Sequence, residues 1–361
     1  MPALLASIGA GSWAVGLIEG VADGLSSFAK LISGLYSDRL RRRKPLAVAG
    51  YFVTAAGMAS FALATQWWHV LLGRVGGWLG RGARGPVRNV LMTEATTPAT
   101  HGRAFGFERA MDSVGAIIGP ALAVVLIPFL GLRGVFALTL IPGIASALVI
   151  LCLVRERSHQ PETHPSWIGS FRALPHEFRR FLSGVGIAGL GDFSKTLLIL
   201  WAAQAFTPER GPERAAALAM LLYVGYNVVY TGSCYLSGWL ADHLSKKWIL
   251  ATGYALAVIP AVALILPGDP LIRFAIAFGF SGLYMGAWET VENTTAATLL
   301  PAKVRGAGFG VLATVNGIGD VVSSATVGLL WDAAPTWAMS FVIGVSILGA
   351  AIIATTHPRT H

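Results

Sequence analysis

Charged residues and cysteines are both scarce in this chain of 361 residues. Only 12% of its residues are charged, against about 25% in ordinary soluble domains, while 54% are apolar. A soluble protein of this length could not bury so much apolar surface, so the composition predicts a protein whose solvent is lipid. The two cysteines, Cys152 and Cys234, fall in separate apolar segments and offer neither a disulfide framework nor metal-ligand spacing.

The sequence also lacks the short motifs that mark common enzyme sites. It contains no phosphate-binding loop, no cluster of metal-ligating residues and no G-x-S-x-G sequence. Nothing therefore favours an enzyme, and we predict neither a cofactor nor a bound metal. A cleavable signal peptide is not expected, because no charged region precedes the first apolar residues.

Long apolar runs, in contrast, are abundant. Several stretches without charge reach or exceed the ~20 residues that cross a bilayer as a helix, and a helix satisfies its own backbone hydrogen bonds in hydrocarbon. We predict an all-α polytopic membrane protein with eleven membrane-spanning helices. Their expected ranges are 11–36, 45–66, 68–94, 104–130, 134–154, 181–206, 215–240, 248–267, 271–299, 306–331 and 336–356.

Lysine and arginine are distributed unevenly over the loops between these spans. The positive-inside rule assigns the basic side to the cytoplasm, which leaves the N-terminus outside. The net charge of +9 is then a consequence of topology, and no nucleic-acid partner is predicted. The poorly basic side carries Arg133, Arg210, Arg214 and Arg273; the basic side carries Arg39, Arg41, Arg42, Arg43, Lys44, Arg103, Arg155, Arg157, Arg172, Arg179, Arg180, Lys246, Lys247, Lys303 and Arg305.

A set of glycines and aspartates recurs at a fixed offset of 204 residues. Repetition at one spacing indicates an internal duplication, which in membrane proteins is typical of transporters. We predict an N-terminal helical bundle at 1–154, a cytoplasmic linker at 155–180 and a C-terminal helical bundle at 181–361. The matched pairs are Gly34 and Gly238, Asp38 and Asp242, Gly102 and Gly306, Gly106 and Gly310, and Gly115 and Gly319.

Eleven is an odd number of helices for a duplicated protein. The first helix of the second half, residues 181–206, maps by the offset onto positions −23 to 2, so its counterpart would end where Met1 begins. We expect that the start has been placed too far downstream. The alternative is that the first helix has been lost.

The linker at 155–180 has two open interpretations. Trp167, Ile168, Phe171 and Leu174 interleave with arginines, a pattern typical of a short amphipathic helix on the inner membrane surface. A plain solvated linker is the alternative.

The residues after the first apolar segment resemble the loop motif G-x-x-x-D-R-x-G-R-[KR] of the major facilitator superfamily. The motif is present as Gly34, Asp38, Arg39, Arg42 and Arg43, with Arg41 replacing the loop glycine. The resemblance covers essentially the whole chain. It implies the facilitator fold, which consists of two halves of six helices each. This chain would contain eleven of these helices.

The resemblance further implies an inner gate, in which the aspartate meets the end of a facing helix and the arginines meet acidic partners. An anion at a helix N-terminus is stabilised by a fraction of a kcal/mol to ~2 kcal/mol. The second copy keeps Gly238 and Asp242 but has His243 where arginine is usual. Glu94 and Arg103 are expected in the same network. Alternatively, the basic loop only determines topology.

A second resemblance is the segment Gly115, Gly119 and Pro120, which matches the G-x-x-x-G-P motif that the family associates with antiporters. Small residues four apart allow helices to approach closely, and proline bends a helix. We therefore predict a helix-packing role for these residues.

Ionisable residues inside the predicted spans need a functional or structural reason to be there, because each costs about 2.5–3.5 kcal/mol at mid-bilayer on insertion scales. Glu19 and Asp23 lie one turn apart on a single polar stripe. Two close carboxylates favour binding a proton, which makes Glu19 or Asp23 a candidate proton carrier. A structural ion pair with an arginine of a neighbouring helix is the equal alternative.

Four arginines share one face of the span 68–94, and the inner two are Arg84 and Arg88. The offset maps Arg88 onto Glu292, and Glu289 lies one turn away, so we expect these carboxylates to oppose the arginines across a central cavity. One interpretation is a charge clamp that opens in one state. The other is an anionic substrate bound by guanidinium groups.

Four further residues are candidates for the proton or substrate path. Asp192 and Lys195 stand three apart, which permits a local ion pair, although this helix often carries substrate or proton residues in the family. Asn227 duplicates Asp23, and Trp288 could stack on a flat ligand or serve in packing.

The leading hypothesis is a secondary active transporter that works by alternating access and exports a small organic solute in exchange for protons. The chain would act as a monomer in the inner, cytoplasmic membrane, with lipid, protons and solute as its partners. The alternatives are an importer or facilitator of an organic anion, and a regulatory or binding protein without transport if the first helix is truly absent.

Overall fold

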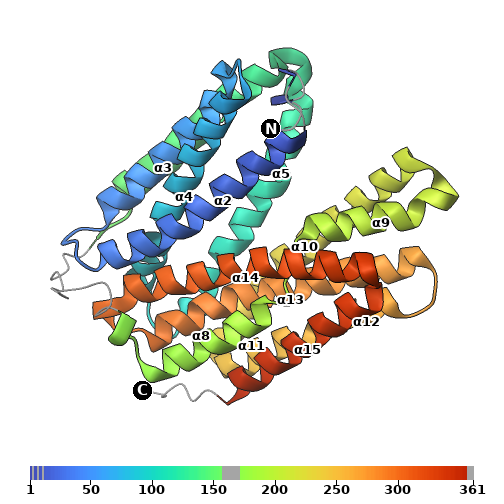
Figure 1. Ribbon diagram of the computed structural model, residues 1–361. Helices are drawn as coiled ribbons and strands as arrows, with labels where there is room; N and C mark the ends of the chain where they lie inside the picture. Colours follow the sequence, from blue (N-terminus) through green and yellow to red (C-terminus); the bar gives the residue numbers. More distant parts are fainter. Residues whose placement is uncertain (2–3, 6–7, 10–11, 157–170, 356–361) are drawn as a thin grey trace. The chain divides into compact units, whose positions relative to one another are not determined.

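The described part of the chain consists of helices joined by short connections. The structure is a computed structural model that describes the chain except for residues 2–3, 6–7, 10–11, 157–170 and 356–361. Figure 1 shows the helices, which are α2 (Ser12–Ser37), α3 (Lys44–Ala59), η1 (Ser60–Leu63), α4 (Trp67–Ala95), α5 (His101–Leu138), α6 (Leu140–Leu153), α8 (His176–Gly189), α9 (Lys195–Arg210), α10 (Pro212–His243), α11 (Lys246–Leu256), α12 (Val258–Ile265), α13 (Pro270–Leu299), η2 (Ala302–Val304), α14 (Arg305–Ala333) and α15 (Pro335–Ala354).

The predicted fold class is confirmed. Within the described residues the helices follow the expected spans, and seven helical segments are long and apolar enough to cross a membrane. Their outer surfaces are strongly apolar: Phe129 is 81% exposed and Leu329 74% exposed. Large apolar side chains on the surface of a membrane-spanning helix are expected to contact the hydrocarbon of the lipid, because lipid, unlike water, solvates them favourably.

Three spans differ in detail from straight helices. The helix expected at 181–206 is interrupted between Gly189 and Lys195, which separates α8 from α9. The predicted span 248–267 is divided at Ala257 into two helices, α11 and α12. The cause is Pro260, which has no N–H to donate to the carbonyl of Leu256 and whose ring crowds that carbonyl. The expected boundary after residue 130 lies at Gly131, which has φ 66° and bends the long helix α5.

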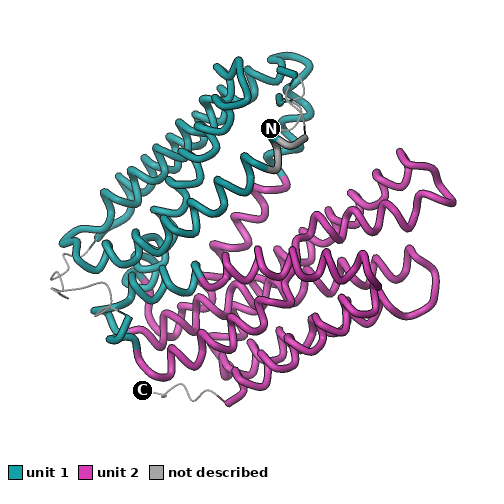
Figure 2. The backbone as a smooth tube through the Cα atoms, viewed as in Figure 1, with its two compact units in different colours: residues 1–95, 118–174, 301–314 teal, residues 96–117, 175–300, 315–361 magenta. Residues whose placement is uncertain are grey.

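The chain divides into two compact units (Figure 2). Unit 1 contains residues 1–95, 118–174 and 301–314; unit 2 contains residues 96–117, 175–300 and 315–361. Two of the boundaries fall inside α5 and α14, and each unit includes one segment from the opposite half of the sequence. The sequence-based division into bundles at 1–154 and 181–361 stays a prediction, and residues 157–170 of the linker lie outside the described residues.

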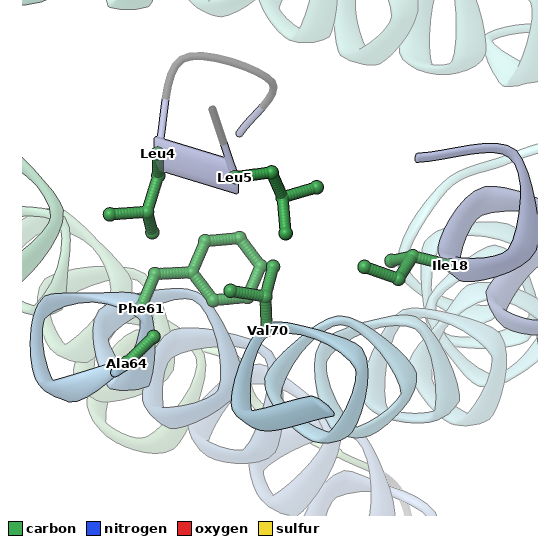
Figure 3. Packing of buried hydrophobic residues seen from close by; sticks show 6 residues of the cluster. All are labelled: Leu4, Leu5, Ile18, Phe61, Ala64 and Val70. Carbon is green, nitrogen blue, oxygen red and sulfur yellow. The ribbon is translucent and has the colours of Figure 1, made fainter. Parts of the chain in front are cut away.

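Unit 1 is built on close contacts of α4 with α2 and α3. A side-chain carbon added at Gly57 of α3 would lie 2.6 Å from the carbonyl oxygen of Gly73 in α4, so only glycine allows this approach. Unit 1 also contains a buried apolar cluster, to which the N-terminal residues contribute. Figure 3 shows this cluster, which consists of Leu4, Leu5, Ile18, Phe61, Ala64 and Val70.

Unit 2 is built on the pairing of α10 with α13, against which α9 and α11 also pack. An added carbon at Gly286 of α13 would lie 2.8 Å from the carbonyl oxygen of Tyr230 in α10. This close approach brings the polar residues of α10 and α13, which include Tyr230 and Glu289, within hydrogen-bonding distance.

Candidate functional site

The first cluster of predicted gate residues lies at the end of α2, within unit 1. Asp38 is 4% exposed and accepts hydrogen bonds from the backbone N–H of Gly306 at 2.8 Å and of Ala307 at 2.7 Å. These are the first N–H groups of α14, which have no partner inside their own helix. A carboxylate at this position satisfies them and interacts favourably with the helix dipole.

Arg43 is the cation of this cluster and is fully buried. Its guanidinium donates to Glu94, to the backbone carbonyl of Ser37 at 3.0 Å, and to Asp38 at 3.4 Å. Arg39 and Arg42, the other two arginines of the motif, are exposed.

A second acidic group reaches the same loop from the segment after α6. The backbone N–H groups of Arg43 and Lys44 donate to Glu156, and the Lys44 ammonium donates to the carbonyl of Val154 at 2.8 Å. Glu156 was not among the residues predicted from the sequence. Its only signal was a single carboxylate directly after a predicted span, opposite a strongly basic loop.

Burial dominates the titration of Asp38, which lies in the loop outside the membrane-spanning segments. It raises the pKa of this carboxyl from its ordinary value of 3.8 to about 6, although the two backbone N–H groups and Arg43 act in the opposite direction.

Unit 2 contains a closely similar cluster at the end of α10. Asp242 accepts hydrogen bonds from the backbone N–H of Gly102 at 2.7 Å and of Arg103 at 3.0 Å, at the start of α5. The Arg103 side chain adds an ion pair with Asp242 at 3.0 Å. Both aspartates that the duplication relates therefore bind the beginning of a helix from the other half of the sequence.

The duplicated glycines make these contacts possible. A side-chain carbon added at Gly34 would collide with the carbonyl of Gly306 and lie 2.8 Å from the Cα of Gly310. One added at Gly238 would collide with the carbonyl of Gly102. The glycine patterns that recur at the 204-residue offset thus pack against one another, and any larger residue would push the helices apart.

The predicted proton carriers of α2 have partners on α4. Glu19 forms an ion pair with Arg74 at 2.6 Å, and Asp23 accepts a hydrogen bond from the indole N–H of Trp78. The Arg74 guanidinium also stacks over Trp78, 3.4 Å from the ring centroid. This arrangement matches the structural ion pair that the sequence left open, and a proton-carrying role for either carboxylate stays a prediction.

The arginines of α4 and the glutamates of α13 belong to different units, so the predicted clamp between them also stays a prediction. Within unit 1, Arg84 lies over the ring of Tyr51 at 4.0 Å. Both Arg84 and Arg88 are partly buried.

Unit 2 supplies its own cation for Glu289. Arg109 of α5 forms an ion pair with Glu289 at 3.4 Å and approaches Glu108 at 3.6 Å. The Tyr230 hydroxyl donates to Glu289 at 2.8 Å. Arg109 was not among the predicted site residues, because its partner is far away in the sequence; the crowding of charge at the start of α5 was the signal that could have found it.

Glu292 is 1% exposed and makes a different set of contacts. The hydroxyl of Tyr254 and the side-chain amide of Asn316 donate to its carboxylate, the latter at 2.8 Å. Trp288, four residues earlier, is 4% exposed and packs against Tyr254 and Tyr284.

The remaining candidates have local partners. The Lys195 ammonium binds Asp192 at 2.6 Å, where the helix is interrupted between α8 and α9, and the Tyr284 hydroxyl donates to Asp192 at 3.3 Å. Asn227 donates to the carbonyl of Tyr223 in its own helix at 2.8 Å. The spacing-based pair of Asp192 and Lys195 is therefore formed.

The glycine–proline motif shows no tight helix contact. A carbon added at Gly115 or Gly119 would meet nothing within 4 Å, and Pro120 is exposed. The packing role of this motif stays a prediction. Among the described residues no cluster of three or more His, Cys, Asp or Glu could hold a metal ion.

Comparisons with known proteins agree with this architecture. A sequence model described as Major Facilitator Superfamily matches residues 1–208. The chain is 26% identical to an uncharacterized MFS-type transporter of Methanocaldococcus jannaschii, over 95% of this chain and 85% of that protein. It is 25% identical to the multidrug resistance protein MdtH of Cronobacter sakazakii, over 92% of this chain and 84% of that protein.

Two solved structures are similar in fold. The Escherichia coli fucose:proton symporter FucP has a TM-score of 0.70 at 17% identity, over 95% of this chain and 92% of that chain. The human organic anion transporter MFSD10 has a TM-score of 0.71 at 15% identity, over 98% of this chain and 89% of that chain.

Proposed function

This chain belongs to the major facilitator superfamily, and from that premise we propose that it is a secondary active transporter that exports a small organic solute in exchange for protons. It works by alternating access, as a monomer in the cytoplasmic membrane, and carries out no enzymatic reaction. The multi-pass membrane fold and the family membership establish the transporter class; direction, coupling and substrate are the proposal.

The observation that carries this proposal is the pair of aspartate contacts. Asp38 binds the first N–H groups of α14, and Asp242 binds those of α5. A carboxylate held by backbone N–H groups has no covalent link to its partner helix, and after separation both the carboxylate and the N–H groups can form hydrogen bonds with water instead. Such contacts suit a gate that must open and close in each cycle.

Export is favoured by the similarity to a multidrug resistance protein over most of both chains. Proton coupling is favoured by the carboxyl groups within the membrane-spanning helices, because such groups are costly there and are typical of proton pathways. No nucleotide-binding motif provides another energy source in the sequence.

The test uses a host strain that lacks its own efflux pumps and expresses the full chain. A panel of fluorescent cationic, neutral and anionic dyes reports accumulation in energised cells. We expect lower accumulation of at least one dye than in cells with an empty vector, and a protonophore should remove the difference. The variant Asp38→Asn should also weaken it.

Two results would contradict the proposal. Equal accumulation of every dye, with the protein present in the membrane, would argue against export. Higher accumulation of an anionic dye would favour the second candidate, import of an organic anion, for which the partly buried Arg84 and Arg88 are the specific observation.

A further inference from the structure

Glu292 is a carboxyl group almost completely removed from solvent inside unit 2. It lies in α13, seven residues before the helix ends at Leu299, and is 1% exposed. At 1.5 Å per residue, this places it about 10 Å from that end of the helix. A carboxylate at such a depth is costly unless a cation pairs with it.

The contacts of Glu292 come from neutral groups instead. Tyr254 of α11 donates its hydroxyl proton to one carboxylate oxygen, and the Asn316 amide of α14 donates to the other at 2.8 Å. Among the described residues, no lysine, arginine or histidine forms an ion pair with Glu292. Arg109 is paired with Glu289, and Lys195 with Asp192.

Both neutral partners can also hold the protonated acid. A side-chain amide presents an NH₂ group and a carbonyl oxygen, so rotation of the Asn316 amide would turn an acceptor toward the acid proton. The Asn316 Oδ1 atom is buried and has no hydrogen bond among the described residues, so turning it breaks no such bond. The Tyr254 hydroxyl can donate to the carbonyl oxygen of the acid as it does to the carboxylate. The site therefore satisfies Glu292 in either protonation state.

The other charged groups around this position are mainly acidic. Glu289 lies one turn earlier on α13, and Asp320 lies one turn beyond Asn316 on α14. The Tyr230 hydroxyl of α10 and Arg109 of α5 both contact Glu289. The helices α12 and α15 carry no titratable side chain.

We propose that Glu292 is a proton-binding site of this transporter, with Tyr254 and Asn316 as its positioning residues. The proton enters and leaves the carboxyl group as the chain changes conformation. This inference rests on the proposed proton-coupled transport and names a proton carrier for it. Glu19, in contrast, forms an ion pair with Arg74.

Infrared difference spectroscopy tests the site without knowledge of the substrate. The purified full chain is reconstituted in lipid and titrated with acid and base, and the carbonyl stretch of protonated carboxyl groups is followed in H₂O and D₂O. We expect a titrating band that is absent from Glu292→Gln. The matched control is Glu289→Gln, which removes a carboxyl group of the same helix that already has an arginine partner. The band assigned to Glu292 should remain in this variant.

The positioning residues give a second measurement. Tyr254→Phe removes a hydrogen bond to the carbonyl oxygen, so the same band should move to higher frequency. A band that persists in Glu292→Gln would overturn the inference, as would the absence of a titrating band in the wild type. Thermal melting of each variant verifies that it is folded.

Flux measurements separate this inference from the proposed function. If the band depends on Glu292 but transport is insensitive to the proton gradient, the proton site stands and the proposed coupling fails. If transport follows the gradient equally in the wild type and Glu292→Gln, the proposed function stands and the inference fails.

Discussion

At the scale of single residues, Arg43 organises the first loop. It is fully buried, and its guanidinium contacts Asp38, Glu94 and the carbonyl of Ser37. Arg42 is adjacent in the sequence but exposed. Neighbouring arginines of one motif therefore have different structural roles, since Arg43 compensates the buried carboxylate of Asp38 and the partly buried carboxylate of Glu94.

We expect Arg43→Ala to lower the free energy of unfolding by about 3 kcal/mol, because removing one partner of a buried ion pair leaves an uncompensated charge. The fall in melting temperature of the detergent-purified protein measures this effect. Arg42→Ala is the matched control and should change stability by less than about 0.5 kcal/mol, as expected of an exposed site. Equal stability of the two variants would show that the buried contacts of Arg43 contribute little.

The pH dependence of stability should report on Asp38. Its pKa is raised to about 6 by burial, so the folded protein binds more protons than the unfolded chain between the ordinary value of 3.8 and 6. The stability that this difference in proton binding contributes is fully present below the ordinary pKa of 3.8 and is lost as pH rises through about 6. The free energy of unfolding should change by about 3 kcal/mol over this range. Melting of the wild type and Asp38→Asn between about pH 4 and 7 measures it. The variant should lose this part of the slope, and parallel curves would contradict the assignment.

At the scale of helices, a glycine in the last turns of α2 and of α10 sets how closely each helix approaches its partner. Gly34 packs on Gly306 and Gly310 of α14, and Gly238 packs on Gly102 of α5. In both places backbone meets backbone, which also brings the following aspartate to the N-terminus of the partner helix. The close approach and the hydrogen bonds therefore depend on each other.

We expect Gly34→Ala to separate α2 from α14 and to destabilise the protein by about 1–3 kcal/mol, the usual cost of overpacking. Gly24→Ala is the control in the same helix, because a carbon added at Gly24 would meet nothing within 4 Å. Melting temperature and dye accumulation measure both variants. A Gly34→Ala protein that behaves like Gly24→Ala would show that the helices adjust at no cost.

At the scale of the whole molecule, the proposed alternating access requires the contacts of Asp38 within unit 1 and those of Asp242 within unit 2 to open together. Cys234 can report this, because it is fully buried on α10 and its carbonyl faces Gly106. We expect Asp38→Asn, which alters only unit 1, to increase the labelling of Cys234 in unit 2 by a thiol reagent several-fold. The background is Cys152→Ser, which removes the other cysteine.

Two further variants complete this experiment. Asp242→Asn should increase labelling directly, because its contacts lie in the same unit as Cys234. Asp332→Asn, an exposed position near the end of α14, should leave labelling unchanged. Increased labelling in Asp242→Asn but not in Asp38→Asn would mean that the two contacts open independently.

The sequence by itself determined the membrane class, the approximate spans and the duplication. Apolar runs of bilayer length must be helical in lipid, and the recurrence of Gly34 and Asp38 at Gly238 and Asp242 can be read without coordinates. The acceptor role of both aspartates at helix ends followed from the family resemblance.

Only the tertiary structure decided which charged side chains form ion pairs and which are bound by neutral groups. It paired Glu19 with Arg74 and Glu289 with Arg109, and it surrounded Glu292 with neutral donors. Partners on one helix can be anticipated from spacing, as for Asp192 and Lys195. Partners on different helices depend on the rotation and depth of each helix, and these are set by packing over the whole bundle.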